Sequence, residues 1–315
     1  MKALRYNYPL LCILAVLAGC GAPVPPAAGF TSVEQSGQSL MSPEAKGENL
    51  LYVSYPSAGT VAVYTYPGAK LVGTLKGFSS PNALCTDKSG DIWISNGGGS
   101  TMVEYAHGGS QPITTLKVKG RPGDCSVDPA SGDLAVSSWS TGEDSFFIYP
   151  HAQEPPVKYH VPFEPDGVAY DDHGNLFVDG RSGLLALGEL PRGKRKMITF
   201  SVPPYDYFGQ VRWDGKYVDV SAYEFILRFS IQGKTAVVAQ KVILDVGKYV
   251  GGYCIKGSHI VATNWFGSRS YGLVASFFKF PAGGRPTKTI SGQAGWGVAI
   301  SMAPSTSHRR NRSDR

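Results

Sequence analysis

The stretch PDGVAYDDHGNLFVDG, residues 165–180, decides the fold of this chain because it describes a unit that recurs. Residues 168–170 and 175–179 carry the Val, Phe and Tyr side chains that suit a pleated, packed strand. Between them, residues 171–174 (DDHG) are Asp, His and Gly, and Asp and Gly tolerate tight turns. The stretch therefore predicts two short antiparallel strands joined by a turn.

The second strand of this unit has counterparts at a nearly constant spacing. They end at Ser54, Ser95, Ser137, Asp179, Ser221 and Thr263, at intervals of 41, 42, 42, 42 and 42 residues. A further β-rich run follows each of them. A period of this size with four strands is typical of a β-propeller blade. The sequence predicts an all-β, six-bladed β-propeller over residues 50–304; a sandwich is the alternative, but its strands rarely keep so constant a spacing.

The phase of the repeat predicts how the ring closes. Residue 50 opens on a second strand with no first strand before it, while WGVAIS, residues 296–301, is a first strand with nothing after it. We expect the C-terminal strand to pair with the N-terminal blade, which places Val298 beside Tyr52. This pairing leaves no open sheet edge between the chain ends.

The repeats PDGVAYDDHGNLFVDG, SPNALCTDKSGDIWIS and RPGDCSVDPASGDLAVS resemble NHL repeats and lactonase-like (gluconolactonase, regucalcin, YncE-like) six-bladed propellers. EYAHGGSQPITTL and FPAGGRPTKTI are similar to segments of a group of bacterial propeller lipoproteins. The resemblance covers residues 50–304 and weakens at QVRWDGKYVDVS and GYCIKGSHIVAT. It implies the fold far more strongly than any activity.

Residues 1–19 have the pattern of a lipoprotein signal peptide. Lys2 and Arg5 precede an apolar run that is too short to span a membrane, and LAGC resembles the bacterial lipobox. The resemblance implies that Cys20 carries a thioether-linked diacylglycerol and a further acyl chain such as palmitate, which together anchor durably. Gly21 after the Cys indicates the outer membrane rather than the inner one. A plain secretory signal with an incidental Cys is the alternative.

The segments on either side of the predicted propeller are polar. Residues 20–49 are rich in Pro, Ala, Gly and Ser, which predicts a flexible tether, and residues 305–315 predict a disordered basic tail. The formal net charge of +6 comes mostly from the leader and this tail, so the propeller itself is close to neutral. A near-neutral body argues against nucleic-acid binding, and we expect a monomer.

The starts of the innermost strands predict one mouth of the central channel. Asn82, Asp124, Asp166 and Gln210 stand there, and oxygen ligands from separate blades suit a hard cation such as Ca²⁺. Lactonase-like propellers hold a metal in this general place with Glu, Asn and Asp ligands. This chain has no Glu at such a position, and no general base is evident beside the ring. We therefore expect no cofactor, with Ca²⁺ as the alternative.

Other side chains are candidates for either a structural role or ligand binding. Trp139, Trp265 and Trp296 lie near polar or Gly loops and could stack on a sugar or peptide at the mouth, or pack between blades. Aspartates that end innermost strands, such as Asp87 and Asp171, precede turns, where they bond backbone amides. Three further cysteines, Cys85, Cys125 and Cys254, lie on innermost strands. Strand parity allows a Cys85–Cys125 disulfide or three separate thiols.

These observations predict a binding or scaffold module rather than an enzyme. The module is tethered through lipid to the cell envelope and contacts an envelope protein, a saccharide or a peptide through its rim loops. The alternative is a Ca²⁺-dependent lactonase-like hydrolase. The identity of the ligand is not written in the sequence.

Overall fold

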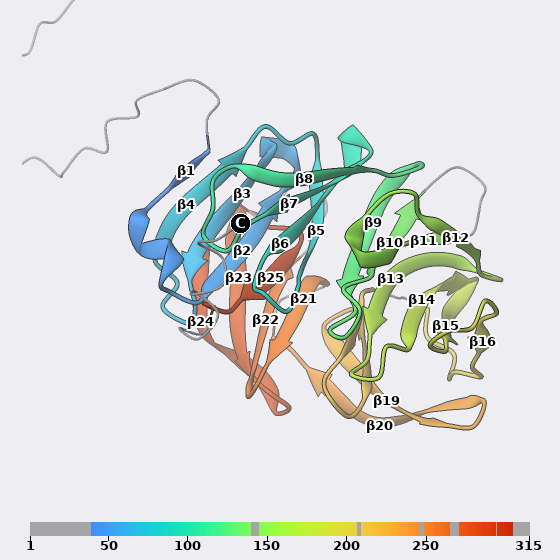
Figure 1. The fold of residues 1–315 in the computed structure, drawn as a ribbon. Coiled ribbons are helices and arrows are strands. Elements are labelled where there is room, and N and C mark those ends of the chain that lie inside the picture. Colours follow the sequence, from blue (N-terminus) through green and yellow to red (C-terminus); the bar gives the residue numbers. More distant parts are fainter. Residues whose placement is uncertain are drawn as a thin grey trace, which may run out of the picture. The chain divides into compact units, whose positions relative to one another are not determined.

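Six antiparallel sheets make up the described part of the chain (Figure 1). The computed structural model describes residues 39–139, 145–206, 209–245, 249–264, 271–293 and 295–304, all within the compact unit Gly37–Arg315. The architecture is the predicted six-bladed β-propeller. Its described helices are short 3-10 turns, and none is long and apolar enough to cross a membrane.

The strands of each blade lie side by side, with the innermost strand at the channel and the outermost at the rim. Blade 1 contains, in spatial order, β1 (Leu40–Met41), β4 (Leu71–Lys76), β3 (Thr60–Thr65), β2 (Leu50–Tyr55) and β25 (Val298–Ser301). Blade 2 contains β5 (Pro81–Thr86), β6 (Ile92–Asn96), β7 (Thr101–Tyr105) and β8 (Pro112–Lys117). Blade 3 contains β9 (Arg121–Val127), β10 (Leu134–Trp139), β11 (Ser145–Tyr149) and β12 (Val157–His160).

The second half of the ring repeats this plan. Blade 4 contains β13 (Glu164–Tyr170), β14 (Leu176–Ser182), β15 (Leu184–Leu190) and β16 (Ile198–Thr199). Blade 5 contains β17 (Val211–Trp213), β18 (Val218–Ala222), β19 (Phe225–Gln232) and β20 (Thr235–Ile243). Blade 6 contains β21 (Val250–Lys256), β22 (His259–Asn264), β23 (Tyr271–Lys279) and β24 (Gly283–Gln293). The 3-10 turns are η1 (Pro43–Lys46), η2 (Pro56–Ala58), η3 (Gly97–Gly99) and η4 (Pro150–Ala152).

Buried side chains between neighbouring blades form the core. Six hydrophobic clusters are present among the described residues, and each combines residues of two adjacent blades, including one cluster that joins blade 6 to blade 1. A second strand is covered on both faces, so its apolar run is continuous rather than alternating. Leu50, Leu51, Tyr52 and Val53 in β2 are all fully buried.

The C-terminal strand closes the ring as the repeat phase predicts. β25 pairs antiparallel with β2, so that Tyr52 faces Ala299 and Val53 faces Val298 (Figure 1). β25 also contacts the innermost strands of the two neighbouring blades, β5 of blade 2 and β21 of blade 6. One blade is thus built from both ends of the described chain, and the ring has no terminal sheet edge at the channel.

Blade 1 begins earlier than the repeat pattern indicates. Leu40 and Met41 form β1 and pair with Thr74 and Gly73 of β4, and Ala45 of η1 is fully buried. Met41 packs against the core shared by blades 1 and 2. Two apolar residues are too few to signal a strand in a Pro- and Ser-rich segment, so this part of the predicted tether is observed as sheet because β4 offers it an unpaired edge.

A disulfide links two neighbouring blades at the channel. Cys85 of β5 and Cys125 of β9 are bonded, with their Cα atoms 5.7 Å apart, and Cys254 is the free cysteine of the described residues. Of the two arrangements that strand parity left open, the structure shows the disulfide. It joins inner strands 40 residues apart in the sequence.

We predict that the Cys85→Ser/Cys125→Ser double substitution lowers the free energy of unfolding by ~2–4 kcal/mol, because a cross-link of this span restricts the unfolded chain. Urea denaturation of the oxidised protein measures the change. Cys254→Ser is the matched control, since it replaces a channel cysteine and keeps the cross-link. Equal midpoints for the double variant and the wild type would contradict the prediction.

Candidate functional site

One mouth of the channel brings together polar side chains from several innermost strands. A small pocket of about 50 Å³ lies there, enough for a few water molecules or one small functional group. Its lining consists of Ala83, Gly123, Asp124, Trp139, Asp166, Gly209, Gln210, Gly251 and Trp296. Five of the residues singled out from the sequence therefore meet at one place, and we name this set the mouth pocket.

Hydroxyl groups at the ends of the second strands hold this mouth together. Ser54, Ser137, Ser221 and Thr263 each accept a hydrogen bond from the backbone N–H of an inner strand of the same blade. Ser54, Ser137 and Thr263 also donate to a carbonyl at the start of the next blade. The repeated Ser or Thr is thus a hydrogen-bonded link between neighbouring blades.

Bulges at the starts of the inner strands decide which side chains enter the channel. Pairing shifts register between Pro81 and Leu84 in β5 and between Pro165 and Val168 in β13. An extra residue at a bulge changes the face to which the following side chains point. The hydroxyl links align Asp124 with Gln210, whereas Asp166 lies one residue earlier in its blade.

Asn82 does not line the mouth pocket. It is 2 % exposed, its amide lies 3.5 Å from the carbonyl of Pro122 in the next blade, and its own carbonyl accepts from Ser54. These contacts place Asn82 in the junction between blades 1, 2 and 3. The predicted four-residue ring is therefore reduced to three residues at the pocket.

Arg212, which the repeat pattern did not indicate, binds two of the side chains that line the mouth pocket. The Arg212 guanidinium, on β17, donates to both oxygens of Asp124 at 2.6 and 3.1 Å and to Oε1 of Gln210 at 2.9 Å. Its Nε donates to the carbonyl of Tyr253. Bidentate pairing of this kind is strong and geometrically specific. Arg212 thus connects blades 3, 5 and 6 across the channel, and below it lies a second cavity of about 260 Å³.

Asp166 is the acid that faces the mouth pocket. Its Oδ1 accepts a hydrogen bond of 2.9 Å from the Trp139 indole. Burial and the neighbouring Asp124 carboxylate raise the pKa of Asp166 to about 7. Near neutral pH this side chain therefore exchanges between a hydrogen-bond acceptor and a donor. The Arg121 guanidinium lies 5.6 Å from the centre of the Trp139 ring, which fixes one wall of the mouth.

Asp179 occupies the position that Ser or Thr holds in the other blades. It is fully buried, and its Oδ1 accepts from the N–H of Gly167 as the hydroxyls do. Its Oδ2 has no hydrogen-bond partner among the described residues. Burial, Asp166 and Asp124 raise the pKa of Asp179 well above its ordinary value. Because no described donor reaches Oδ2, a neutral carboxylic acid costs less to bury here than a carboxylate.

Gly167 makes this close approach possible. A Cβ on Gly167 would come within 2.6 Å of the backbone nitrogen of Val211 in the next blade. Only glycine leaves room for β13 and β17 to converge here. The innermost strands are therefore crowded at this position.

The donors at the mouth do not suit a calcium ion. Calcium needs six to eight oxygens at one point, and it competes poorly where a cation is already present. Both oxygens of Asp124 and Oε1 of Gln210 bind Arg212, and Oδ1 of Asp166 binds Trp139. The guanidinium thus already compensates the charge that would attract the metal.

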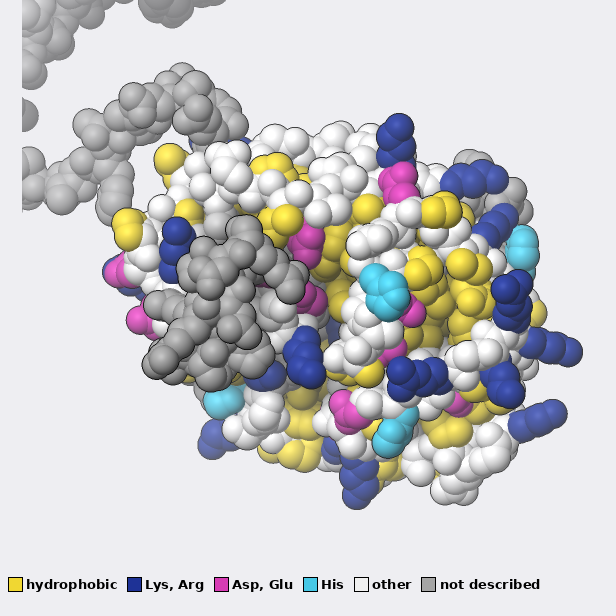
Figure 2. All heavy atoms as spheres, viewed as in Figure 1, with side chains coloured by type: hydrophobic (Ala, Val, Ile, Leu, Met, Phe, Trp, Pro, Cys, Tyr) yellow, Lys and Arg dark blue, Asp and Glu magenta, His cyan; other side chains and the backbone are white. Residues whose placement is uncertain are grey.

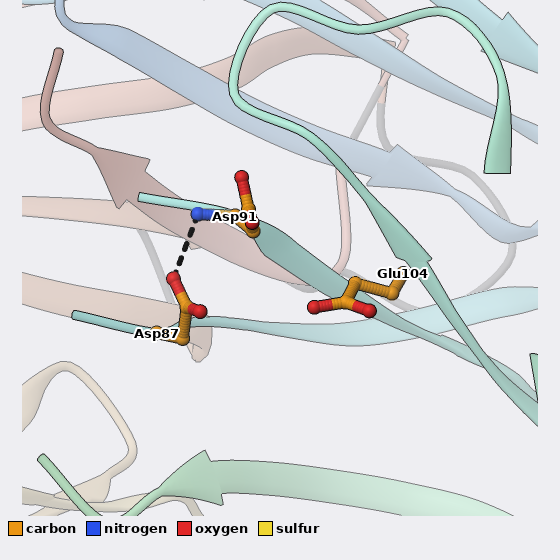
Figure 3. Close-up of side chains that lie close together, drawn as sticks. All are labelled: Asp87, Asp91 and Glu104. Atoms are coloured by element: carbon orange, nitrogen blue, oxygen red, sulfur yellow. Dashed lines mark hydrogen bonds between the residues drawn. The ribbon is translucent and has the colours of Figure 1, made fainter. Parts of the chain in front are cut away.

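A second group of acids lies on blade 2. Asp87, Asp91 and Glu104 place carboxylate oxygens within 4.8 Å of one another (Figure 3). Asp87 accepts from the backbone amides of Ser89 and Asp91, and Asp91 accepts from the amide of His107. These bonds give Asp87 the turn-stabilising role predicted for aspartates that end inner strands, and Asp91, just before β6, bonds a loop amide in the same way.

The other terminal aspartates behave alike. Asp128 accepts from the amide of Ala130, and Asp171 accepts from those of His173 and Asn175. Asp214 accepts from the amides of Lys216 and Tyr217. The structural interpretation of these residues is confirmed.

Blade 5 contains a buried charge cluster outside the channel. Arg228 forms ion pairs with Asp214 and Asp219, and its guanidinium lies between the rings of Tyr217 and Phe280, at 4.5 and 4.6 Å from their centres. Burial and Asp214 raise the pKa of Asp219 to about 8. Phe280 follows β23, so this cluster fastens blade 5 to blade 6.

Some of the predicted functional residues lie outside the described residues. Cys20 and Trp265 are among them, together with the leader (residues 1–19) and the basic tail (residues 305–315). Lipidation at Cys20 and stacking by Trp265 therefore stay predictions.

Comparisons with known proteins support the fold. No protein-family model matches this sequence, and no curated protein matches it. A protein of unknown function from Bacteroides caccae superposes with a TM-score of 0.60 at 11% identity, covering 81% of this chain and 99% of that one. A structure of a nidogen/laminin complex gives 0.62 at 11% identity, covering 82% and 99%.

An enzyme is also among the structural matches. Virginiamycin B lyase from Staphylococcus aureus superposes with a TM-score of 0.52 at 12% identity, covering 67% of this chain and 72% of that chain. At such low identity these matches establish the propeller fold alone, because unrelated functions share it. The chain therefore belongs with the broad group of β-propellers by architecture.

We predict that Asp179→Ser is more stable than the wild type at pH 8 by ~1 kcal/mol or more, and that this difference is smaller at pH 5. A buried acid with a raised pKa contributes stability that is present below about pH 4 and lost as the pH rises through the folded-state pKa. Serine supplies the hydroxyl found in the other blades and does not ionise. Urea denaturation at both pH values measures the effect.

The control for this substitution is Glu224→Gln, which removes one negative charge from an exposed position. It leaves the pH dependence of stability unchanged. With Asp166 and Asp219 still present, some loss of stability between pH 5 and pH 8 remains in Asp179→Ser. A variant that is less stable than the wild type at pH 8 would show that Asp179 is ionised and stabilising.

Proposed function

We propose that this protein is a lipid-anchored β-propeller of the bacterial cell envelope that binds a saccharide or peptide group at its channel mouth. The observation that carries the proposal is the position of Asp166 in the mouth pocket, with Trp139 and Trp296 in the same lining. An acid beside aromatic walls on rigid strands is a common way to hold a polar group in a fixed orientation.

The side chains of the mouth are already held in place, so we expect a ligand to bind without a large conformational change. Arg212 binds both oxygens of Asp124 and Oε1 of Gln210, which fixes these two lining side chains in place. Asp166 remains the adjustable partner, because its pKa of about 7 lets it accept from, or donate to, a hydroxyl or amide. A pocket of about 50 Å³ takes only one group, so the rest of the ligand lies on the surrounding rim loops.

The envelope location rests on the sequence. The lipobox-like LAGC at residues 17–20 and Gly21 support anchoring at Cys20 in the outer membrane, where the propeller faces the periplasm or the exterior. A monomer with a membrane attachment and an envelope ligand is consistent with the near-neutral body of the chain.

We predict that Asp166→Asn weakens ligand binding at least ~10-fold, since a hydrogen bond to a charged group contributes about 1.5–3 kcal/mol. Glycan and peptide arrays probed with the detergent-purified full-length chain select the ligand, and tryptophan fluorescence measures its affinity. Asp172→Asn, an exposed acid outside the mouth that accepts from Trp213, is the control. Selected ligands that bind Asp166→Asn as tightly as the wild type would refute binding at this site.

A Ca²⁺-dependent hydrolase of the lactonase type is the second candidate. The pKa of Asp166 near neutrality favours it, because a general base works best near the operating pH. Against it stands the Arg212 guanidinium, which binds the oxygens of Asp124 and Gln210.

We predict that Ca²⁺ at millimolar concentration neither raises the melting temperature of the full-length chain nor supports turnover of aliphatic lactones. Calorimetric titration and a lactone panel measure both. Arg212→Gln, which removes the resident cation, serves as the comparison and is the variant in which metal affinity would first emerge. Micromolar Ca²⁺ affinity in the wild type that disappears in Asp166→Ala would favour the hydrolase.

A further inference from the structure

A groove between the outer edges of blades 3 and 4 lies apart from the channel. It encloses about 660 Å³ and is lined by Val157, Lys158, Tyr159, His160, Val161, Pro162, Arg195, Lys196, Met197 and Thr199. We name it the edge groove. One wall is β12 with the two residues that follow it, and the other is the segment that leads into β16.

The backbone of β12 offers a template for another strand. β12 is the outermost strand of blade 3, and its outer edge pairs with no other described strand. In an antiparallel ladder every second residue directs its N–H and C=O away from the existing partner. Such edges accept extended segments from other chains, with backbone hydrogen bonds supplying affinity.

The facing wall leaves room for such a segment. β16 has only two residues, Ile198 and Thr199, and the stretch before it turns at Pro191, whose carbonyl accepts from the amide of Lys194. Pro191 and Gly193 lie in the turn that follows β15, and because β16 is so short, blade 4 does not fill the space beside β12. The edge groove is therefore a consequence of this short outer strand.

The charged side chains that line the edge groove are all positive. Lys158, Arg195 and Lys196 are its charged lining residues, and no acidic residue lines it. The larger groove between blades 2 and 3, about 870 Å³, is lined by Asp87, Glu104, Asp128 and Glu154 as well as by Lys88 and Lys117. Of these two grooves, the edge groove is therefore the one that selects for negative charge by electrostatic complementarity.

Apolar side chains supply the floor. Val157, which lines the edge groove, is 40% exposed although it lies in a strand. The Tyr159 ring stacks on Phe146 with centres 5.2 Å apart, and Met197 packs against the core of blades 3 and 4. Figure 2 shows hydrophobic side chains in the region of β12 and β16, bordered by Lys and Arg. Alternating acidic and apolar residues in an extended segment match this floor and rim.

We propose that the edge groove binds an extended acidic segment of a partner protein, which adds as a further strand to the outer edge of β12. Its apolar side chains contact Val157 and Met197, and its carboxylates pair with Arg195 and Lys196. Partner binding here is separate from the channel mouth and does not depend on what the mouth pocket binds.

The same cations would also attract anionic lipid, but two observations favour a protein segment. The cations line a concave groove beside an unpaired strand edge, and a lipid surface makes no use of backbone groups. Strand β1, where the described chain begins, lies on the opposite side of the view from β12 and β16 (Figure 1). The edge groove therefore lies on a different side of the ring from the point where the N-terminal segment enters it.

Fluorescence anisotropy tests the proposal with the detergent-purified full-length chain and a labelled peptide of alternating Asp and Val residues. We expect saturable binding that weakens as NaCl is raised, because ion pairs at the rim are screened. A peptide with Lys in place of Asp does not bind. An Asp–Val peptide with N-methylated alternate amides binds at least ~10-fold more weakly, because it cannot complete the ladder.

Charge reversal locates the site. Arg195→Glu/Lys196→Glu weakens binding of the acidic peptide at least ~10-fold, while Lys234→Glu/Arg285→Glu, the same exchange at exposed positions of blades 5 and 6, leaves it unchanged. Thermal unfolding checks that both variants fold. No binding of the acidic peptide, or equal loss in both variants, would overturn the proposal. So would binding of dihexanoylphosphatidylglycerol that depends on Arg195 and Lys196 and displaces the peptide, which would identify the groove as a lipid site.

Discussion

The pairing of β25 with β2 is the constraint on which the rest of this structure depends. A propeller has no core of its own at the centre; its stability comes from the faces of neighbouring sheets, and an open array leaves two of those faces exposed. Closing the ring buries the cluster that blades 6 and 1 share. It also sets the start of β25 beside blade 6, where the Trp296 carbonyl accepts from Gly252 and Thr263. The mouth pocket is thus completed by the same contact that closes the fold.

The ionisable groups of the mouth lie in blades whose residues differ from the common repeat. Four blades place a hydroxyl at the end of the second strand and a backbone amide opposite it, and these links need no charge. Blade 4 substitutes Asp179, and blades 3 and 5 add the Asp124–Arg212 pair. Burying a charge costs free energy unless the charge is paired. A blade that has a buried charged residue where the other blades have a neutral one is therefore a candidate for function. Asp166, which retains a raised pKa beside a pocket, fits this description best.

The strands and the ring closure could be predicted because a constant period leaves few alternatives. Asp124, Asp166, Gln210, Trp139 and Trp296 do meet at the mouth, since each stands at or near an inner strand end. The bulges could not be predicted, and the bulge in β5 places Asn82 in the junction between blades rather than at the pocket. Their effect on side-chain direction also left the Cys85–Cys125 disulfide undecided.

Arg212 was missed although the sequence carried a signal for it. Two residues before the end of each inner strand, the repeat has the small residues Cys85, Ser126, Ala169 and Cys254, and only QVRWD places a large cation there. A lone arginine among small residues that face a channel needs an acid to pair with, and Asp124 is that acid. Strand β1 gave no such signal, because its pairing depends on the open edge of β4 and not on its own composition.

Hydrogen exchange at the C-terminal strand tests the central claim most directly. The amides of β25 should exchange as slowly as those of β2 in the native full-length chain, because the two strands share one ladder at the centre of a closed ring. Peptide-resolved mass spectrometry covers residues 298–301 and 50–55 in one experiment. Exchange of residues 298–301 at the rate of an exposed chain end, with β2 still protected, would show an open array and contradict this account.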